Sequence, residues 1–299
     1  MNILSWYVSV LYKIMKLIGL QPKEVEIEPG TVMHFFAPCE RDNKKPNVVL
    51  VHGFAGDGLT TWQLQMISLG KKYNVYVPDL IFFGKSHSTR SERSTRFQAD
   101  CLAKALKKLG VEEKCVYVGF SYGGFVGFQF AEHYPELVGS MVITGSSVAW
   151  SESLNKKALN RIGFNSMAEV LLPTTVDGVK TLLDVGSYSF PPMPKFFYKH
   201  FLEVMFNNRK ERAELLAGLV VPDENVSTHQ FKQTIHLLWG KEDVLTDEEA
   251  AISLQERLGG KGMLKLVEKA GHLVLQERPF VFNKYLNEML ASLAKENSY

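Results

Sequence analysis

The sequence predicts an α/β fold with a mainly parallel central sheet, helices on both faces and an inserted helical cap. Three observations support this: apolar runs alternate with helical patterns after Pro29, the alternation stops after Ser146, and it resumes near His229. The chain has 299 residues, of which 45% are hydrophobic, and its net charge is +2. This composition is typical of soluble globular proteins and excludes disordered, collagen-like and small disulfide-rich chains.

Residues 1–20 are predicted to form a separate amphipathic helix. A polar stripe, spaced three or four residues apart, consists of Asn2, Ser5, Ser9, Lys13 and Lys16. The opposite, apolar stripe consists of Ile3, Trp6, Val10, Ile14, Leu17 and Ile18. The lysines follow the apolar residues, unlike in a secretory signal, and the apolar run is shorter than the ~20 residues of a membrane span. Two hypotheses stay open: the helix lies in a membrane interface with Trp6 and Tyr7 at headgroup depth, or it packs on its own domain or at a dimer contact.

The α/β core is predicted over residues 25–146 and 229–299. Its strands are short apolar runs, as buried parallel strands require: Thr31–Ala37, Val48–Val51, Val75–Pro78, Cys115–Gly119, Met141–Thr144, Thr234–Trp239 and Met263–Val267. The first is expected to belong to an antiparallel edge hairpin that turns at residues 40–46. Helical patterns separate the runs: Thr60–Leu69, Phe97–Leu109, Tyr122–Tyr134, Asp247–Leu258 and Pro279–Ala294.

Residues 147–228 interrupt the alternation and are interpreted as the cap. This stretch is rich in Leu, Phe, Met and Tyr, and its helical periods are broken by Pro173 and by the prolines of residues 190–194.

Gly119-Phe120-Ser121-Tyr122-Gly123 follows a predicted strand and opens a predicted helix. This is the setting of a nucleophile elbow, a sharp turn that exposes the serine hydroxyl above the sheet. Glycines beside the serine remove side chains that would collide in such a turn. Ser121 is therefore the candidate nucleophile.

A serine hydroxyl needs a base, and the base needs an orienting carboxylate. His272 and Asp243 each follow a predicted strand, and open α/β sheets place their sites at the carboxyl ends of strands. We take these two as base and acid, because Ser–Asp–His is the chain order of such triads. Alternatives remain: His52, His87, His200 or His229 as the base, and Asp247 or Glu242 as the acid.

Acyl transfer also needs donors for the developing oxyanion. The candidates are two backbone amides: that of Tyr122, directly after the nucleophile, and that of Phe54, in a glycine-rich loop after a strand. A glycine-rich turn without a ligand is the alternative for the second loop.

Other site classes find no support in the sequence. Gly84-Lys85-Ser86 lacks the earlier glycine of a phosphate-binding loop, and Ser121 stands where a dinucleotide fingerprint needs glycine. Metal-ligand spacing is absent, so no cofactor is expected, and charges of both signs are too interspersed to favour nucleic acid. Three scattered cysteines indicate a reducing compartment, so we expect a cytoplasmic protein, peripheral on a membrane if the first helix binds one.

The stretches VVLVHGF, VYVPDL, GFSYGG, LLWGKED and AGH, in this order, resemble the α/β-hydrolase superfamily over roughly residues 25–295. The similarity is to its capped esterase, lipase and epoxide-hydrolase-like branch, including monoacylglycerol-lipase-like hydrolases. One departure is that Ile81 and Phe82 replace the proline and glycine of the family's Asp-Leu-Pro-Gly loop, which puts any pocket wall formed there in doubt.

The resemblance implies a serine hydrolase that cleaves a small, lipid-like or otherwise apolar carboxylic ester through an acyl-enzyme. Candidate pocket walls in the cap are Trp150, Phe190, Met193, Phe196 and Phe197, with simple cap packing as the alternative. Two other functions stay open: hydrolysis of a carbon–carbon bond in ring-cleavage products, and a ligand receptor on the same fold.

Overall fold

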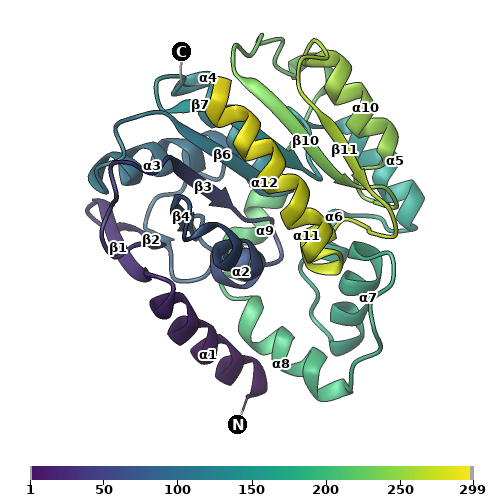
Figure 1. The fold of residues 1–299 in the computed structure, drawn as a ribbon. Helices are drawn as coiled ribbons and strands as arrows, with labels where there is room; N and C mark the ends of the chain where they lie inside the picture. Colours follow the sequence, from purple (N-terminus) through teal and green to yellow (C-terminus); the bar gives the residue numbers. More distant parts are fainter. Residues whose placement is uncertain (1, 297–299) are drawn as a thin grey trace.

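The computed structural model describes residues 2–296 and has a central sheet covered by helices on both faces (Figure 1). The sheet has the strand order β1-β2-β4-β3-β6-β7-β10-β11, with the short β5 (His87–Ser88) paired to β2. The strands are β1 (Leu20–Glu28), β2 (Thr31–Pro38), β3 (Asn47–Val51), β4 (Asn74–Pro78), β6 (Cys115–Phe120), β7 (Val138–Thr144), β10 (Thr234–Gly240) and β11 (Leu264–Val267). Neighbours from β4 to β11 run parallel, which confirms the predicted α/β class.

Two apolar cores lie on the two faces of the sheet. Alternate residues of one strand enter different cores, as the pleat requires: Val48 and Leu50 enter one, and Val49 and Val51 the other. The first core is closed by α2 (Gly58–Leu69) and α12 (Pro279–Glu296), and the second by α3 (Thr95–Lys108), α4 (Tyr122–His133) and α10 (Glu248–Arg257). Helices therefore cover both faces of the sheet, and only the ends of its strands remain accessible for a site.

Between β7 and β10 the chain leaves the sheet and forms a layer of helices. These are α5 (Glu152–Ile162), α6 (Met167–Leu171), α7 (Val176–Gly186), α8 (Lys195–Met205) and α9 (Arg209–Ala217). Two short strands, β8 (Trp150–Ser151) and β9 (Val220–Val221), pair in parallel and bring the two ends of this segment together. The boundaries 147–228 for a cap stay a prediction.

The first helix, α1 (Ile3–Leu17), begins after Asn2, whose side-chain oxygen accepts from two backbone amides. Its inward face carries Leu11 and Met15, which are buried in the core beside α2 and α12. The predicted apolar stripe does not face inward, because Trp6 is 54% exposed and Leu17 is 86% exposed. Apolar residues cover most of this helix's circumference, so the spacing alone could not determine which face packs. No helix within the described residues is long and apolar enough to cross a bilayer.

The predicted edge hairpin exists, but its predicted turn is wrong. β2 pairs antiparallel with β1, which precedes it, and the chain turns at Pro29-Gly30, where Gly30 has φ +80°. Residues 40–46 instead lead to β3, which is separated from β2 by β4. β1 escaped prediction because it is polar, with Lys23, Glu24 and Glu26 near its middle, as is common for an edge strand.

Candidate active site

Ser121 lies at the turn between β6 and α4, with φ 52° and ψ −118°. A residue other than glycine rarely adopts a positive φ, so this backbone is strained and must be held by its surroundings. The Ser121 amide donates to Thr144 O on the neighbouring strand (2.8 Å), and Gly124 N donates to Ser121 O (2.8 Å). These two hydrogen bonds hold the backbone of Ser121 in the turn at the carboxyl end of β6.

Glycine at position 123 is required by close packing of α4 against the sheet. A Cβ atom there would lie 2.4 Å from Val51 O and 2.7 Å from His52 O. At Gly119, a Cβ would lie 2.8 Å from Gly123 O. The two glycines let the helix start directly against β3, which keeps the serine close to the loop that follows this strand.

His272 lies between Ser121 and Asp243 in space, although it is 151 residues from Ser121 and 29 residues from Asp243 along the chain. Ser121 Oγ lies 2.9 Å from His272 Nε2, and His272 Nδ1 lies 2.7 Å from Asp243 Oδ2. Asp243 follows β10, and His272 follows β11, so three strand ends supply the three side chains. The two distances show that Ser121, His272 and Asp243 lie together at one edge of the sheet.

Asp243 is held rigidly and kept from water. Its Oδ1 accepts from the amides of Leu245 (2.8 Å) and Thr246 (2.9 Å), and its Oδ2 accepts from the Thr246 hydroxyl (2.7 Å) as well as facing His272. A carboxylate only accepts hydrogen bonds, so His272 Nδ1 must carry the proton. His272 Nε2 is then free to accept a proton from the Ser121 hydroxyl.

The alternative acids from the sequence, and His52 among the alternative bases, are engaged elsewhere. Asp247 caps α10 by accepting from Ala250 N (3.0 Å) and pairs with Arg161, while Glu242 accepts from Ala270 N (3.0 Å). His52 Nδ1 donates to Gly53 O (2.7 Å), and its Nε2 accepts from Leu80 N (2.9 Å). Burial lowers the pKa of His52 to about 4, which keeps this imidazole neutral.

Phe54 and Tyr122, whose backbone amides are the predicted donors, line a small cavity of about 60 Å³ together with Ser121. Neither amide has a hydrogen-bond partner among the described residues. Tyr122 N is also the first amide of α4, where the helix dipole favours negative charge. Both donors are therefore available to an oxyanion formed next to Ser121.

The loop that departs from the family pattern lies beneath the site and does not line the pocket. Phe83 packs its ring against Phe54, Tyr122 and His52, with centroids 5.2 Å, 5.9 Å and 5.2 Å away. Phe82 adopts φ 74° and is buried. Nothing in the sequence pattern pointed to Phe83 as the support of both candidate amides.

A buried arginine from the helical layer fixes this loop. Arg212, on α9, donates to Phe82 O (3.1 Å) and Met205 O (2.7 Å), and its guanidinium lies 4.4 Å from the Phe83 ring centroid. Burial lowers the pKa of Arg212 to about 10, and the nearby charges of Asp57 and Asp79 oppose this. Arg212 was not predicted as a functional residue, because its partners are backbone carbonyls that no sequence motif marks.

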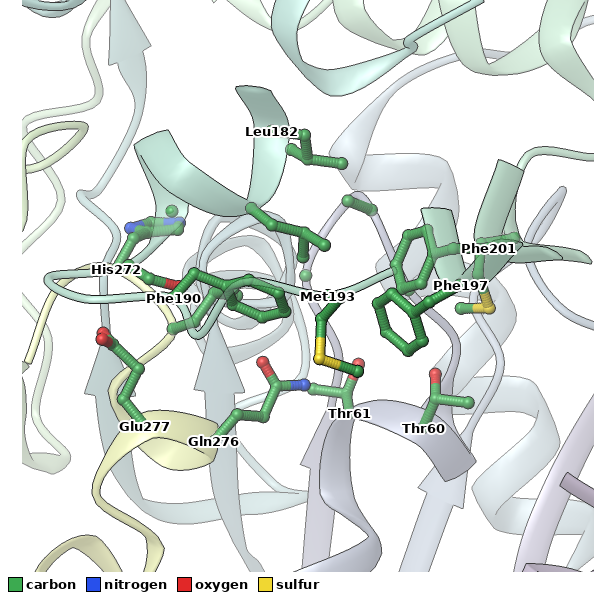
Figure 2. Close-up of a pocket in the computed structure, with 18 of the residues that line it drawn as sticks. Thr60, Thr61, Leu182, Phe190, Met193, Phe197, Phe201, His272, Gln276 and Glu277 are labelled. Atoms are coloured by element: carbon green, nitrogen blue, oxygen red, sulfur yellow. The ribbon is translucent and has the colours of Figure 1, made fainter. Parts of the chain in front are cut away.

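A large pocket of about 980 Å³ opens from Ser121 and His272 toward the surface. Four of the five predicted pocket residues line it: Phe190, Met193, Phe196 and Phe197. The fifth, Trp150, lines a separate small cavity that Ser121 also lines. Figure 2 shows the apolar side chains of the helical layer facing Thr60, Thr61, Gln276 and Glu277 on the opposite wall.

The first helix also lines this pocket, which the sequence did not indicate. Ile3, Leu4, Trp6 and Tyr7 all belong to the lining, and the Tyr7 hydroxyl is hydrogen-bonded to Gln63 on α2. No group of three or more His, Cys, Asp or Glu residues within residues 2–296 is arranged to hold a metal ion. The site consists of a serine, an imidazole and a carboxylate beside a pocket whose walls are mainly apolar and carry polar side chains on one side.

Comparison with known proteins gives a family model described as alpha/beta hydrolase fold, which matches residues 46–166. Monoacylglycerol lipase ABHD6 of Bos taurus is 25% identical over 288 residues, which cover 93% of this chain and 84% of that protein. The chain has the α/β-hydrolase fold.

Two solved structures extend the comparison. The hydrolase superposes on a membrane phospholipase A, described as a bacterial virulence factor, with a TM-score of 0.79 and 22% identity, over 98% of this chain and 91% of that chain. It superposes on the meta-cleavage product hydrolase CumD with a TM-score of 0.71 and 21% identity, over 90% of this chain and 98% of that chain. Each likeness is one of fold.

Proposed function

We propose that the hydrolase cleaves a carboxylic ester with Ser121 as nucleophile, His272 as base and Asp243 as the carboxylate that orients the imidazole. The observation that supports this most is the continuous pair of hydrogen bonds, Ser121 Oγ to His272 Nε2 at 2.9 Å and His272 Nδ1 to Asp243 Oδ2 at 2.7 Å. A hydroxyl hydrogen-bonded to an oriented neutral imidazole is the arrangement that activates a serine.

The reaction follows from this arrangement. As Ser121 Oγ forms a bond to the ester carbon, its proton passes to His272 Nε2, and the carbonyl oxygen becomes an anion held by the Phe54 and Tyr122 amides. Collapse of this intermediate breaks the ester bond, and the leaving alcohol takes the proton from Nε2. Water, deprotonated by the same nitrogen, then attacks the acyl-enzyme and releases the carboxylic acid and free Ser121.

The substrate we propose is an ester with one long apolar chain and a small polar alcohol, such as a monoacylglycerol. The large pocket, about 980 Å³ and lined mainly by aliphatic and aromatic side chains, suits the chain, and the 60 Å³ cavity admits only a small group. Similarity to relatives named as monoacylglycerol lipases supports the same class.

Carbon–carbon bond hydrolysis is the competing use of this triad, and solved relatives include a hydrolase of a hexadienoate. Such a substrate carries a carboxylate, which a site usually binds with Lys or Arg. The described residues that line the small cavity beside Ser121 include neither, whereas Lys269 and Arg278 belong to the lining of the large pocket. We favour ester cleavage because the large pocket is lined mainly by aliphatic and aromatic side chains.

A substrate panel tests the proposal: p-nitrophenyl acetate, a long-chain monoacylglycerol and a ring-cleavage dienoate, each with wild type and Ser121→Ala. We expect turnover of both esters, a higher kcat/KM for the monoacylglycerol, and loss of both activities in the variant. Preferential cleavage of the dienoate would contradict ester hydrolysis. A single acylation without further turnover would favour the receptor hypothesis.

We also keep, as a proposal, that residues 1–20 make a peripheral membrane contact. The outward Trp6 and Leu17 support it, as does the likeness in fold to a membrane phospholipase.

A further inference from the structure

Exposed apolar side chains gather where the large pocket opens to the surface. Eleven large apolar side chains are exposed among the described residues, and five of them also line this pocket. We call these five the rim: Ile3, Trp6, Tyr7, Tyr188 and Phe196. The rim is thus one surface continuous with the pocket interior, and soluble proteins rarely expose such a patch without a binding role.

Four of the five rim residues lie on two helices that contact each other, and Tyr188 lies in the segment between α7 and α8. α1 and α8 lie side by side at the end of the molecule that carries the N-terminus (Figure 1). Asn2 Nδ2 donates to Glu203 Oε2 (2.9 Å), and Ile3 N donates to His200 Nδ1 (3.2 Å), both on α8. The far half of α1 is anchored in the core by Leu11 and Met15. The rim therefore belongs to the folded protein and is not a loose end.

The two helices that carry most of the rim also carry basic side chains. Lys13 and Lys16 lie on α1 and Lys195 lies on α8, all exposed and without an ion pair among the described residues. Lys199 is 4.0 Å from Glu203, the one acidic side chain of α8. On α1, Trp6, Lys13 and Leu17 are spaced by seven and four residues, so a tryptophan, a lysine and a leucine share the outward face.

We propose that the rim docks on the surface of a lipid bilayer that contains anionic lipid, and that substrate enters the pocket directly from the bilayer. Trp6, Tyr7 and Phe196 would enter the headgroup and upper acyl region, where amphipathic aromatic side chains are favoured. The lysines would then lie among the phosphates. The route of the substrate rests on the proposed function, whereas the docking itself needs no turnover.

A bilayer fits this surface better than a second copy of the chain. A symmetric dimer through the rim would bring the lysines of both copies toward each other, and like charges at an interface oppose association. Anionic lipid complements the same lysines. On a bilayer, the opening of the pocket beside the rim would face the acyl chains that the pocket is proposed to bind.

Tryptophan fluorescence gives a direct test, because Trp6 is 54% exposed and the other three tryptophans are buried. Full-length protein is mixed with vesicles of phosphatidylcholine and phosphatidylglycerol whose acyl chains carry bromine. We expect quenching in wild type and its loss in Trp6→Phe. Equal fluorescence with brominated and unbrominated vesicles would overturn the proposal.

Vesicle sedimentation measures the charge and apolar contributions with residues outside the pocket. Leu17→Ser/Lys13→Gln should bind the same vesicles at least about fivefold more weakly, which is the loss expected from the lysine alone. Its kcat/KM for p-nitrophenyl acetate should equal that of wild type, since neither residue lines the pocket. Ile252→Ser is the control, because Ile252 is as exposed as Ile3, at 42%, but lies on α10, away from α1 and α8 (Figure 1).

The outcomes separate docking from catalysis. Vesicle binding that persists in Ser121→Ala, together with ester turnover by wild type, supports both proposals. Binding without any ester turnover would leave docking in place and contradict the proposed function. Ester turnover with equal vesicle binding by wild type and Leu17→Ser/Lys13→Gln would contradict docking. A concentration-dependent dimer that Trp6→Ser abolishes, and that does not dissociate when vesicles are added, would contradict it as well.

Discussion

At the scale of single residues, the site depends on side chains whose hydrogen-bonding capacity is fully used. Asp243 accepts four hydrogen bonds, and only one of them comes from His272. The residue types and the order of Ser121, Asp243 and His272 could be predicted, because each follows a strand with a recognisable motif. The contacts that orient Asp243 could not, since backbone amides leave no trace in the sequence.

Asp243→Asn tests the acid against its runner-up. An amide at this position favours the wrong imidazole tautomer, so kcat for an ester substrate should fall about 10⁴-fold, as in other serine triads. Asp247→Asn should change kcat by less than about twofold, because Asn is an equally good helix cap and the lost ion pairs are partly exposed. A larger effect of Asp247→Asn than of Asp243→Asn in steady-state kinetics would refute the assignment.

His52 makes a pH-dependent contribution to stability. Burial lowers its pKa in the folded protein to about 4 from about 6.5, so between these pH values only the unfolded chain binds the proton. Stability should therefore fall as the pH drops through this window, by on the order of 3 kcal/mol.

The measurement is chemical denaturation of wild type and His52→Gln at pH 6.5 and pH 4. All other titrating groups are shared, so the wild type should lose more free energy of unfolding than the variant between the two pH values. Identical losses would show that His52 is not kept neutral by the fold.

At the scale of secondary-structure elements, all seven predicted strands and all five predicted core helices are present, with ends shifted by three residues or fewer. The largest shift is at β7, which begins at Val138, because Gly139-Ser140 reads as a turn in the sequence. The polar β1 was missed, and the sequence did not determine which face of α1 packs on the core. In both cases tertiary packing determines which residues are buried, and the pattern of apolar residues within the segment does not predict that packing.

The contact of α9 with the loop after β4 can be tested through Arg212. Arg212→Met keeps the length of the side chain but leaves the buried carbonyls of Phe82 and Met205 without these donors. The free energy of unfolding should fall by roughly 2 kcal/mol or more. Lys210→Met, an exposed change on the same helix, should leave it nearly unchanged. Equal stability of the two variants in urea denaturation would refute the role of Arg212 in holding this loop.

At the scale of the whole molecule, the pocket is assembled from segments that no local pattern connects. α1, α2, the segment after α7, α8 and the turn around α11 (Val274–Glu277) all contribute to its lining. The grouping of Ser121, Asp243 and His272 was predictable because parallel strands end at one edge of a sheet. The pocket walls were predictable only within the helical layer. The 35 residues 18–52 separate α1 from Gly53, the next residue of the lining, and no pattern in them indicates that α1 packs beside the pocket.

The central claim is that Ser121 is a nucleophile activated by His272. Reaction of the full-length hydrolase with a fluorophosphonate, followed by peptide mass spectrometry, tests it directly. The account predicts covalent labelling on Ser121 in wild type, much slower labelling in His272→Gln and none in Ser121→Ala. Equal labelling of wild type and Ser121→Ala, or a label on a different residue, would contradict it.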